Sequence, residues 1–224
     1  MNILVISAHP DDETLGCGGT LLRHAAKGDR IHWAVATQAD EARYGKEAAR
    51  KAAEVEAVAK AYPIAQIHRL GHAPARLDQV SCQDLTEALA KVVAASKPEI
   101  VYTVGPHDAH SDHRVLFAAA AAALKSFRAG DQLRRVLVYE TLSSTDASLS
   151  PASSFRPTVF VDVTPTLERK LEILALYASE MQPLPLPRNA ETCRALARVR
   201  GAAAGVACAE AFELLREVDR AGKV

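Results

Sequence analysis

Apolar residues lie along the chain in short runs, and longer segments of mixed polarity separate these runs. Most of the runs are rich in Ile, Val and Leu and do not alternate with polar residues, which is typical of β-strands buried on both faces. The predicted strands are residues 2–8, 30–37, 64–70, 99–104, 135–141 and 157–163. The segments between them have helical spacing of apolar residues or are rich in Ala, and they predict helices that end near residues 27, 62, 96, 127, 178 and 204.

The alternation of strands and helices determines the predicted fold class. Each helix returns the chain to the same end of the sheet, so the pattern implies right-handed βαβ units. We therefore expect an α/β fold of the Rossmann-like type, with a mainly parallel sheet flanked by helices. With 224 residues and no repeat or clear linker, the chain is predicted to form a single domain over residues 1–224. The pattern leaves the strand order open and assigns no element to residues 207–218.

Composition and charge narrow the classes of partner. The 27 basic and 27 acidic residues give a net charge of zero without a basic block, which argues against a nucleic-acid or membrane-surface partner. No apolar stretch has the length of a membrane span, and the first run lacks a basic leader, which favours a strand over a signal peptide. The four cysteines lack CxxC spacing and predict reduced thiols in a cytoplasmic protein. The Ala-rich helices could pack in the core or in a homo-oligomer.

A polar cluster follows the first predicted strand: His9, Pro10, Asp11, Asp12 and Glu13. The proline cannot extend a central strand, so these side chains lie at the strand's carboxyl end, where open α/β sheets bind ligands. An imidazole nitrogen of His9 and a carboxylate oxygen of Asp12 suit a divalent metal such as zinc, and Asp11 could act as a general base. When this loop is considered alone, capping of the next helix by the acids explains it about as well.

A second polar loop follows the fourth predicted strand. It holds three of the eight histidines, His107, His110 and His113. Since the carboxyl ends of parallel strands lie at one edge of the sheet, we expect the two loops to meet. His9, Asp12 and one later histidine would then form a His₂–carboxylate site with open positions, the arrangement of a catalytic zinc ion. Non-haem Fe(II) enzymes use the same ligands, so the ligand set does not fix the chemistry.

The two loops together resemble the motifs of a known family. Residues 8–19, AHPDDETLGCGG, and residues 110–113, HSDH, are similar to the motifs of the LmbE/PIG-L family of zinc-dependent sugar de-N-acetylases. The HPDDE string followed by a distal HxDH is highly specific, and the resemblance covers most of the chain. It implies an LmbE-like fold and the release of acetate from an N-acetylated amino sugar.

The resemblance implies metal ligands and a general base. In the family, the residues that match His9, Asp12 and His113 bind zinc, and the residue that matches Asp11 activates the attacking water. We expect Zn²⁺ as the cofactor, with Fe²⁺ as an alternative in a reducing cytoplasm. His107 stays the main alternative to His113 as a ligand.

The resemblance also implies roles for His110 and Asp112. The residue that matches His110 stabilises the oxyanion or protonates the leaving amine, and the residue that matches Asp112 orients and tunes that histidine. The predicted function is therefore a metal-dependent N-deacetylase with a small-molecule amino-sugar substrate. The alternatives are an amidase acting on another amide of a glucosamine conjugate, a non-haem Fe(II) or nucleotide-binding protein using the same sheet edge, and a metal-binding module without activity.

Substrate contacts are expected near the same loops. Many family members carry a Pro-Asp-Gly-like turn after the third strand, whereas residues 72–76 of this chain contain no acid. The candidate substrate contacts are Arg43, His72, Arg76 and Arg114. The alternative for each arginine is a solvated surface charge, and this alternative is favoured for Arg43. Tyr177 and Glu180 could equally pack at a helix end.

Overall fold

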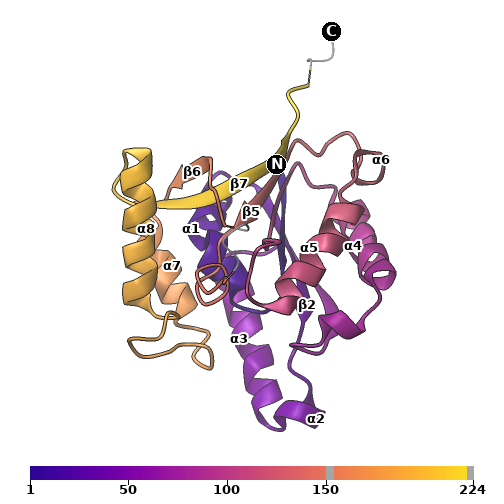
Figure 1. Ribbon diagram of the computed structural model, residues 1–224, viewed down its shortest axis with the longest axis horizontal. Coiled ribbons are helices and arrows are strands. Elements are labelled where there is room, and N and C mark those ends of the chain that lie inside the picture. Colours follow the sequence, from indigo (N-terminus) through magenta and orange to yellow (C-terminus); the bar gives the residue numbers. More distant parts are fainter. Residues whose placement is uncertain (150–153, 221–224) are drawn as a thin grey trace.

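The computed structural model describes residues 1–149 and 154–220, so parts of the predicted domain, 150–153 and 221–224, lie outside the described residues. Within these ranges it contains one seven-stranded sheet with helices on both faces (Figure 1). The strands are β1 Asn2–Ser7, β2 Arg30–Thr37, β3 Gln66–His72, β4 Ile100–Thr103, β5 Arg135–Tyr139, β6 Val159–Asp162 and β7 Ala209–Glu217. The helices are α1 Asp12–Ala26, α2 Glu41–Tyr44, α3 Glu47–Ala61, the 3₁₀ helix η1 Leu77–Gln79, α4 Cys82–Ser96, α5 Ser111–Ala123, α6 Ser126–Ala129, α7 Leu167–Leu174 and α8 Ala190–Ala204.

The strand order is β3-β2-β1-β4-β5-β7-β6. The first five strands pair in parallel, which confirms the predicted α/β fold with a mainly parallel sheet. From β1 the chain winds outward through β2 to β3 and then crosses to β4 on the other side of β1. The winding therefore reverses between β1 and β4, and ligands of open α/β sheets bind at such a reversal. The loops that follow these two neighbouring strands lie at the same edge of the sheet.

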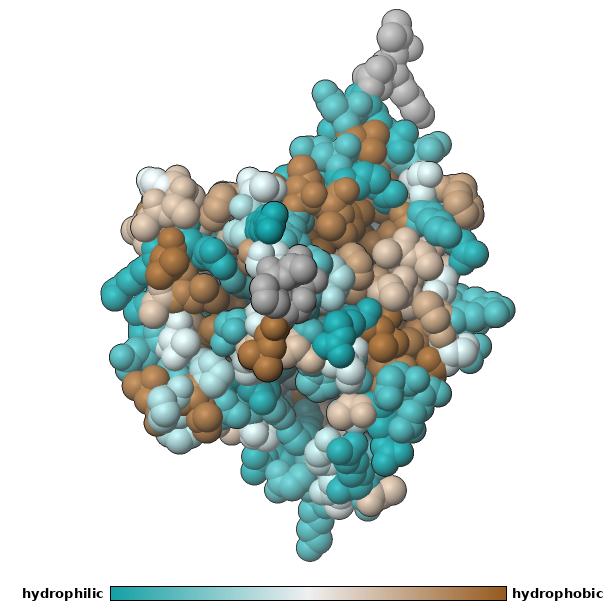
Figure 2. All heavy atoms as spheres, in the orientation of Figure 1, coloured by the Kyte–Doolittle hydropathy of each residue, from teal (hydrophilic) through white to brown (hydrophobic). Residues whose placement is uncertain are grey.

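Helices form a layer on each face of the sheet (Figure 1). On one face α4 packs against α5, and on the other α7 packs against α1, α3 and α8. The core includes the fully buried β1 residues Ile3, Leu4 and Val5. Gly16 allows α1 to approach β5 closely, because a Cβ atom there would lie 2.1 Å from the Tyr139 ring. On the face shown in Figure 2, hydrophilic residues cover the projecting α2–α3 end and hydrophobic residues lie in several separate groups.

The structure places β7 in the segment to which the sequence pattern assigns no element. This strand is antiparallel to β5 and to β6, so β6 becomes the edge strand at the end of the sheet opposite β3. Glu210 of β7 is buried, where its carboxylate accepts hydrogen bonds from the N–H groups of Gly19 (2.8 Å) and Thr20 (2.7 Å). Lys170 of α7 pairs with the same carboxylate at 2.7 Å. A buried charge removes the regular apolar alternation by which a strand is recognised in a sequence.

Two predicted helices are divided in the structure. The helix predicted to end near residue 62 consists of α2 and α3, which are separated at Gly45, where φ is 52°. The helix predicted to end near residue 127 consists of α5 and the short α6. Within the part of the chain that the structure describes, no helix has both the length and the apolar composition needed to cross a bilayer.

We expect Lys170→Met to be strongly destabilising. The substitution leaves the buried Glu210 carboxylate without its cation, and removal of one member of a buried ion pair costs about 3–5 kcal/mol. Urea denaturation measures the change in the free energy of unfolding. Arg194→Met is the matched control, because Arg194 pairs with Glu168 at the surface and such pairs contribute little. A loss in Lys170→Met as small as that in the control would contradict the expected contribution of the buried pair.

Candidate active site

The loop between β1 and α1 places His9 and Asp12 at the carboxyl end of the central strand. Asp12 Oδ2 accepts hydrogen bonds from the backbone N–H groups of Ala8 (3.0 Å) and His9 (2.8 Å). Asp12 Oδ1 lies 3.3 Å from Nε2 of His113. Helix capping does not account for Asp11, which occupies the N-cap position but makes no side-chain capping bond with a described residue.

The loop between β4 and α5 supplies the second group of side chains. His110 is the N-cap residue of α5, and its Nδ1 accepts a hydrogen bond from the backbone N–H of Asp112 at 3.1 Å. The helix therefore begins at Ser111, and the buried His113 lies in its first turn. Since β1 and β4 are adjacent parallel strands, this loop meets the first one, as the sequence predicts.

His9, Asp12 and His113 direct ligand atoms toward a common point. We call these three residues the ligand triangle. His113 Nε2 lies 3.3 Å from His9 Nδ1 and 3.3 Å from Asp12 Oδ1, and His9 Nδ1 lies 3.7 Å from Asp12 Oδ2. Ligand atoms at about 2.0–2.1 Å from a tetrahedral zinc ion are about 3.3–3.4 Å from one another. The spacing and the two-imidazole, one-carboxylate donor set therefore fit a catalytic metal ion.

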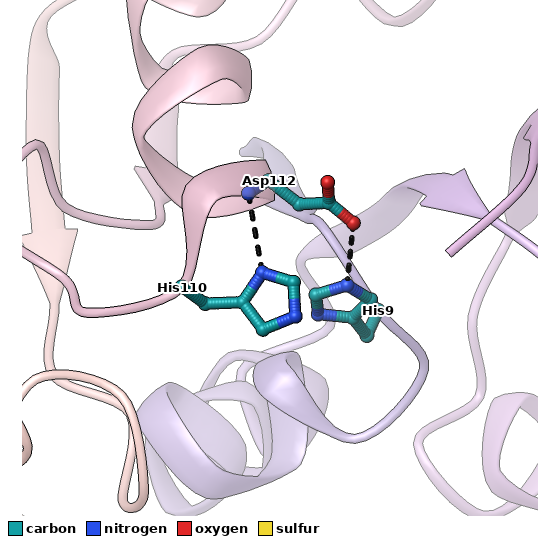
Figure 3. A group of neighbouring side chains, drawn as sticks. All are labelled: His9, His110 and Asp112. Atoms are coloured by element: carbon teal, nitrogen blue, oxygen red, sulfur yellow. Dashed lines mark hydrogen bonds and ion pairs between the residues drawn. The ribbon is translucent and has the colours of Figure 1, made fainter. Parts of the chain in front are cut away.

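Each histidine of the ligand triangle has a second carboxylate partner. His9 Nε2 lies 2.9 Å from Asp112 Oδ2 (Figure 3), and His113 Nδ1 lies 2.7 Å from Asp108 Oδ2. An ionised carboxylate only accepts hydrogen bonds, so each pair places the ring proton on the outer nitrogen. When such a ring binds a metal in its neutral form, its lone pair is then on the nitrogen that faces the ligand triangle, as metal binding requires.

Asp112 has a different partner from the one that the family resemblance implies. Its carboxylate contacts His9, and it also accepts hydrogen bonds from the backbone N–H groups of Ala75 (2.7 Å) and Leu77 (3.0 Å). The hydrogen bond between Asp112 and His110 uses the Asp112 backbone N–H (Figure 3). The carboxylate therefore orients His9 and ties the loop after β3 to the site.

Asp108 is a site residue that sequence reasoning missed. It is buried, and its Oδ1 accepts a hydrogen bond from the Thr145 hydroxyl at 2.6 Å while its Oδ2 contacts His113. The signal in the sequence was the position of Asp108 itself, five residues before the candidate ligand His113. Spacing alone could not distinguish it from the other acids of a polar loop, because the contact depends on how the loop turns.

His110 lies beside His9, with ring centroids 4.4 Å apart (Figure 3). Burial, together with the neighbouring His9 and His113, lowers the pKa of His110. His9, His110 and Asp112 are also close enough to hold a metal, but the Asp112 carboxylate already has three hydrogen-bond partners. His107 belongs to neither of the two possible ligand groups found among the described residues.

Asp11 is buried next to the ligand triangle. Its backbone φ of 114° is rare for a residue with a side chain. Burial and the adjacent Asp12 raise the pKa of Asp11 well above its ordinary value, and the Arg188 guanidinium opposes this shift. A strained backbone and a carboxyl group with a raised pKa in one residue are typical of a functional site.

Glu13 supports the turn that carries Asp11. Its Oε2 accepts a hydrogen bond from the Asp11 backbone N–H at 3.2 Å. Its Oε1 accepts hydrogen bonds from the hydroxyls of Thr14 (2.6 Å) and Tyr177 (2.8 Å). Burial raises the pKa of Glu13 to about 7. Tyr177 therefore packs against the turn through a defined hydrogen bond, in addition to lining the pocket described next.

A pocket of about 410 Å³ lies beside the ligand triangle. Apolar side chains, including those of Val35, Val55 and Leu142, form part of its wall. Besides Asp11 and Asp12, the charged residues that line the pocket are Lys51, Glu54, Arg69, Glu180 and Arg188. All three cations have carboxylate partners, so the wall presents paired charges and not a cationic patch.

The four residues predicted to contact substrate are not among the described residues that line the pocket: Arg43, His72, Arg76 and Arg114. Arg43 donates a hydrogen bond to the carbonyl oxygen of Pro74 at 2.7 Å. Arg114 donates to the carbonyl oxygens of Asp108 (2.7 Å) and Ala109 (2.6 Å). Both arginines thus donate hydrogen bonds to loop carbonyl oxygens. The geometry does not support substrate contact by any of the four residues.

We expect Asp108→Asn to weaken metal binding by about 10–100-fold, the usual effect of removing the carboxylate behind a ligand histidine. The neutral amide no longer favours the proton on His113 Nδ1. Competition with a chelator of known zinc affinity measures the change. Asp78→Asn, at an exposed position of η1, is the matched control and should bind zinc like the wild type. Equal affinities of the two variants would limit Asp108 to a role in folding.

Known proteins are similar to this chain in sequence and in fold. The family model PIG-L, GlcNAc-PI de-N-acetylase, matches residues 4–124 of the chain. An uncharacterized deacetylase, YaiS, from Escherichia coli strain K12 is 32% identical over 170 residues, which cover 72% of this chain and 81% of the relative.

Two solved structures show that the whole chain follows a known fold. N,N′-diacetylchitobiose deacetylase from Pyrococcus horikoshii is 22% identical with a TM-score of 0.74, over 96% of this chain and 83% of that chain. GalB, the 4-carboxy-2-hydroxymuconate hydratase from Pseudomonas putida KT2440, is 18% identical with a TM-score of 0.76, over 100% of both chains. These two enzymes catalyse different reactions, so the likeness establishes the fold and not the reaction. Because the family model spans more than half of the sequence and the relative YaiS is similar over most of its length, the chain belongs to the PIG-L (LmbE) family.

Proposed function

We propose that the protein is a metal-dependent hydrolase that removes the acetyl group from an N-acetylated amino sugar or sugar conjugate. The observation that carries this proposal is the ligand triangle with the buried carboxylate of Asp11 beside it, both lining one pocket. A site that only binds a metal does not need a buried carboxylate at a strained position next to its ligands. The deacetylases among the relatives support acetate as the product.

Zn²⁺ is the proposed metal, and Fe²⁺ is the alternative because the same donor set accepts it. When bound, zinc would lower the pKa of a water molecule to about 7 and polarise the amide carbonyl. His9, Asp12 and His113 would hold the ion, and the carboxylates of Asp112 and Asp108 would keep the two imidazoles in the required tautomers.

Asp11 and His110 would act on the amide itself. Asp11 takes a proton from the attacking water and passes it to the leaving amine, so that one water is consumed and acetate and a free amine are formed. His110 Nδ1 accepts the Asp112 backbone N–H, so the neutral ring carries its proton on Nε2. That N–H can donate a hydrogen bond to the charge that develops on the carbonyl oxygen.

The pocket supports a small-molecule substrate. Its volume of about 410 Å³ falls in the usual range of about 300–1,000 Å³ for such sites. Paired charges along the wall provide both donors and acceptors, which suits the hydroxyl groups of a sugar ring.

Acetate release from a panel of N-acetylated sugars tests the proposal. Zinc-loaded protein is expected to release acetate from at least one member of a panel of free, nucleotide-linked and aglycone-linked N-acetylglucosamine. Chelator-treated protein should release none until zinc is restored. Acetate from the chelated protein would contradict metal dependence, and a zinc-loaded protein inactive on every sugar would contradict the proposed substrate class.

A further inference from the structure

Arg188 reaches Asp11 from a distant part of the chain. Its Nη1 lies 3.0 Å from Asp11 Oδ2 and 3.1 Å from Glu180 Oε2. The guanidinium lines the same pocket as the ligand triangle, yet the chemistry proposed above gives it no role. The contact with Asp11 nevertheless places it directly against the proposed general base.

The backbone on both sides of Arg188 is fixed by hydrogen bonds. The carbonyl oxygen of Arg188 accepts a hydrogen bond from the Gln182 N–H at 2.8 Å, which closes the proline-containing segment 182–188 on itself. The next residue, Asn189, is the N-cap of α8, and its Oδ1 accepts the Thr192 N–H at 2.9 Å. The Arg188 side chain therefore starts from a defined point between a closed turn and a helix.

Glu180, the second carboxylate partner of Arg188, is itself held by α3. It forms an ion pair with Lys51, and Lys51 Nζ also donates a hydrogen bond to the Ser179 hydroxyl at 3.0 Å. An alternating row of charges thus runs along the pocket from Asp11 through Arg188 and Glu180 to Lys51. The Arg188 guanidinium is therefore held by Glu180, which Lys51 of α3 holds in turn. These groups lie outside the loop that carries Asp11.

Two features of this contact are unfavourable for stability. Asp11 has the rare φ of 114°, and Arg188 Nε is buried with no hydrogen-bond partner among the described residues. An unsatisfied buried donor and a strained backbone are both destabilising. Such features persist mainly where a site requires the resulting geometry.

We propose that Arg188 is a positioning residue, which holds Asp11 by Oδ2 and so orients the carboxylate for removal of a proton from the attacking water. The inference rests on the proposed function of Asp11 as the general base. Arg188 gains and loses no proton: the proton moves from the water to Asp11 and then to the leaving amine. Since Arg188 contacts Oδ2, the other oxygen of the carboxylate stays available for the transferred proton.

Kinetics of Arg188→Ala and Arg188→Lys test this role on the sugar that the wild type deacetylates. Arg188→Ala should lower kcat by about 10²-fold, as expected when a catalytic group is displaced, with KM and bound zinc unchanged. Arg188→Lys should retain part of kcat, and added guanidinium should restore part of the activity of Arg188→Ala. Arg194→Ala, in α8 with its partner Glu168 at the surface, is the matched control and should behave like the wild type. A raised KM with unchanged kcat would overturn the proposal in favour of a substrate contact.

Crystal structures of the wild type and Arg188→Ala provide a readout that does not depend on activity. We expect the Asp11 carboxylate to rotate or to occupy more than one conformation in the variant, while the ligand triangle keeps its geometry. An Asp11 carboxylate in the same single position in both structures would overturn the positioning role. A wild type that releases no acetate contradicts the proposed function, and in that case this structural comparison still decides whether Arg188 orients Asp11.

Discussion

Asp11→Asn should lower kcat for acetate release by about 10²–10⁴-fold, the range attributed to a general base. The amide has nearly the same size and shape as the carboxylate but cannot accept the proton of the attacking water. Asp11 is not a member of the ligand triangle, so the variant should keep its zinc. Steady-state kinetics together with metal analysis of the same sample measures both quantities.

Asp146→Asn is the matched control for this experiment, since Asp146 is exposed in the loop after β5. It should keep both full activity and full zinc content. An Asp11→Asn variant with the activity of this control would remove Asp11 from the chemistry. A variant that loses its zinc would make Asp11 a contributor to metal binding.

His113→Gln should lower zinc affinity by more than 100-fold, because the loss of a ligand exceeds the roughly 10–100-fold effect of losing a partner behind a ligand. His113 Nε2 is adjacent to both other members of the ligand triangle at 3.3 Å. Since a metal that binds the native state raises its apparent stability, added zinc should raise the Tm of the wild type and leave that of the variant nearly unchanged.

His107→Gln is the informative comparison, because His107 is the alternative ligand on sequence grounds. It should bind zinc and respond in Tm like the wild type. Zinc loss in His107→Gln, with retention in His113→Gln, would exchange the two assignments. Calorimetric titration of zinc into both apo variants supplies the affinities.

The juxtaposition of the two polar loops could be predicted because it depends on a general property of parallel sheets. His9 and Asp12 directly follow one strand, and His113 lies just past another, so both loops are expected at one edge of the sheet. Their contact also requires that the two strands be neighbours, which the strand order β1-β4 provides and which the sequence pattern leaves open. The pattern could not reveal β7, because the charge of its buried Glu210 is neutralised by Lys170, which lies in a helix distant in sequence.

Site residues that depend on tertiary contacts could not be predicted. Arg188 meets Asp11 across 177 residues of sequence, and a proline-containing segment carries no local signal for such a contact. The prediction that Arg43 and Arg114 contact substrate rests on residue type and position along the chain, but a long arginine side chain binds whichever carbonyl groups are close. Their hydrogen bonds go to loop carbonyls. The cytoplasmic location and a homo-oligomeric state stay predictions from composition.

Stepwise zinc titration of the metal-free protein, with acetate release measured at each addition, tests the central claim most directly. One ion in the ligand triangle should give activity that rises linearly to one equivalent of zinc and then stays level. Full activity before any zinc is added would contradict metal-dependent hydrolysis. A rise that continues to two equivalents would show that the group of His9, His110 and Asp112 also holds a required ion, and that the single-metal account is wrong.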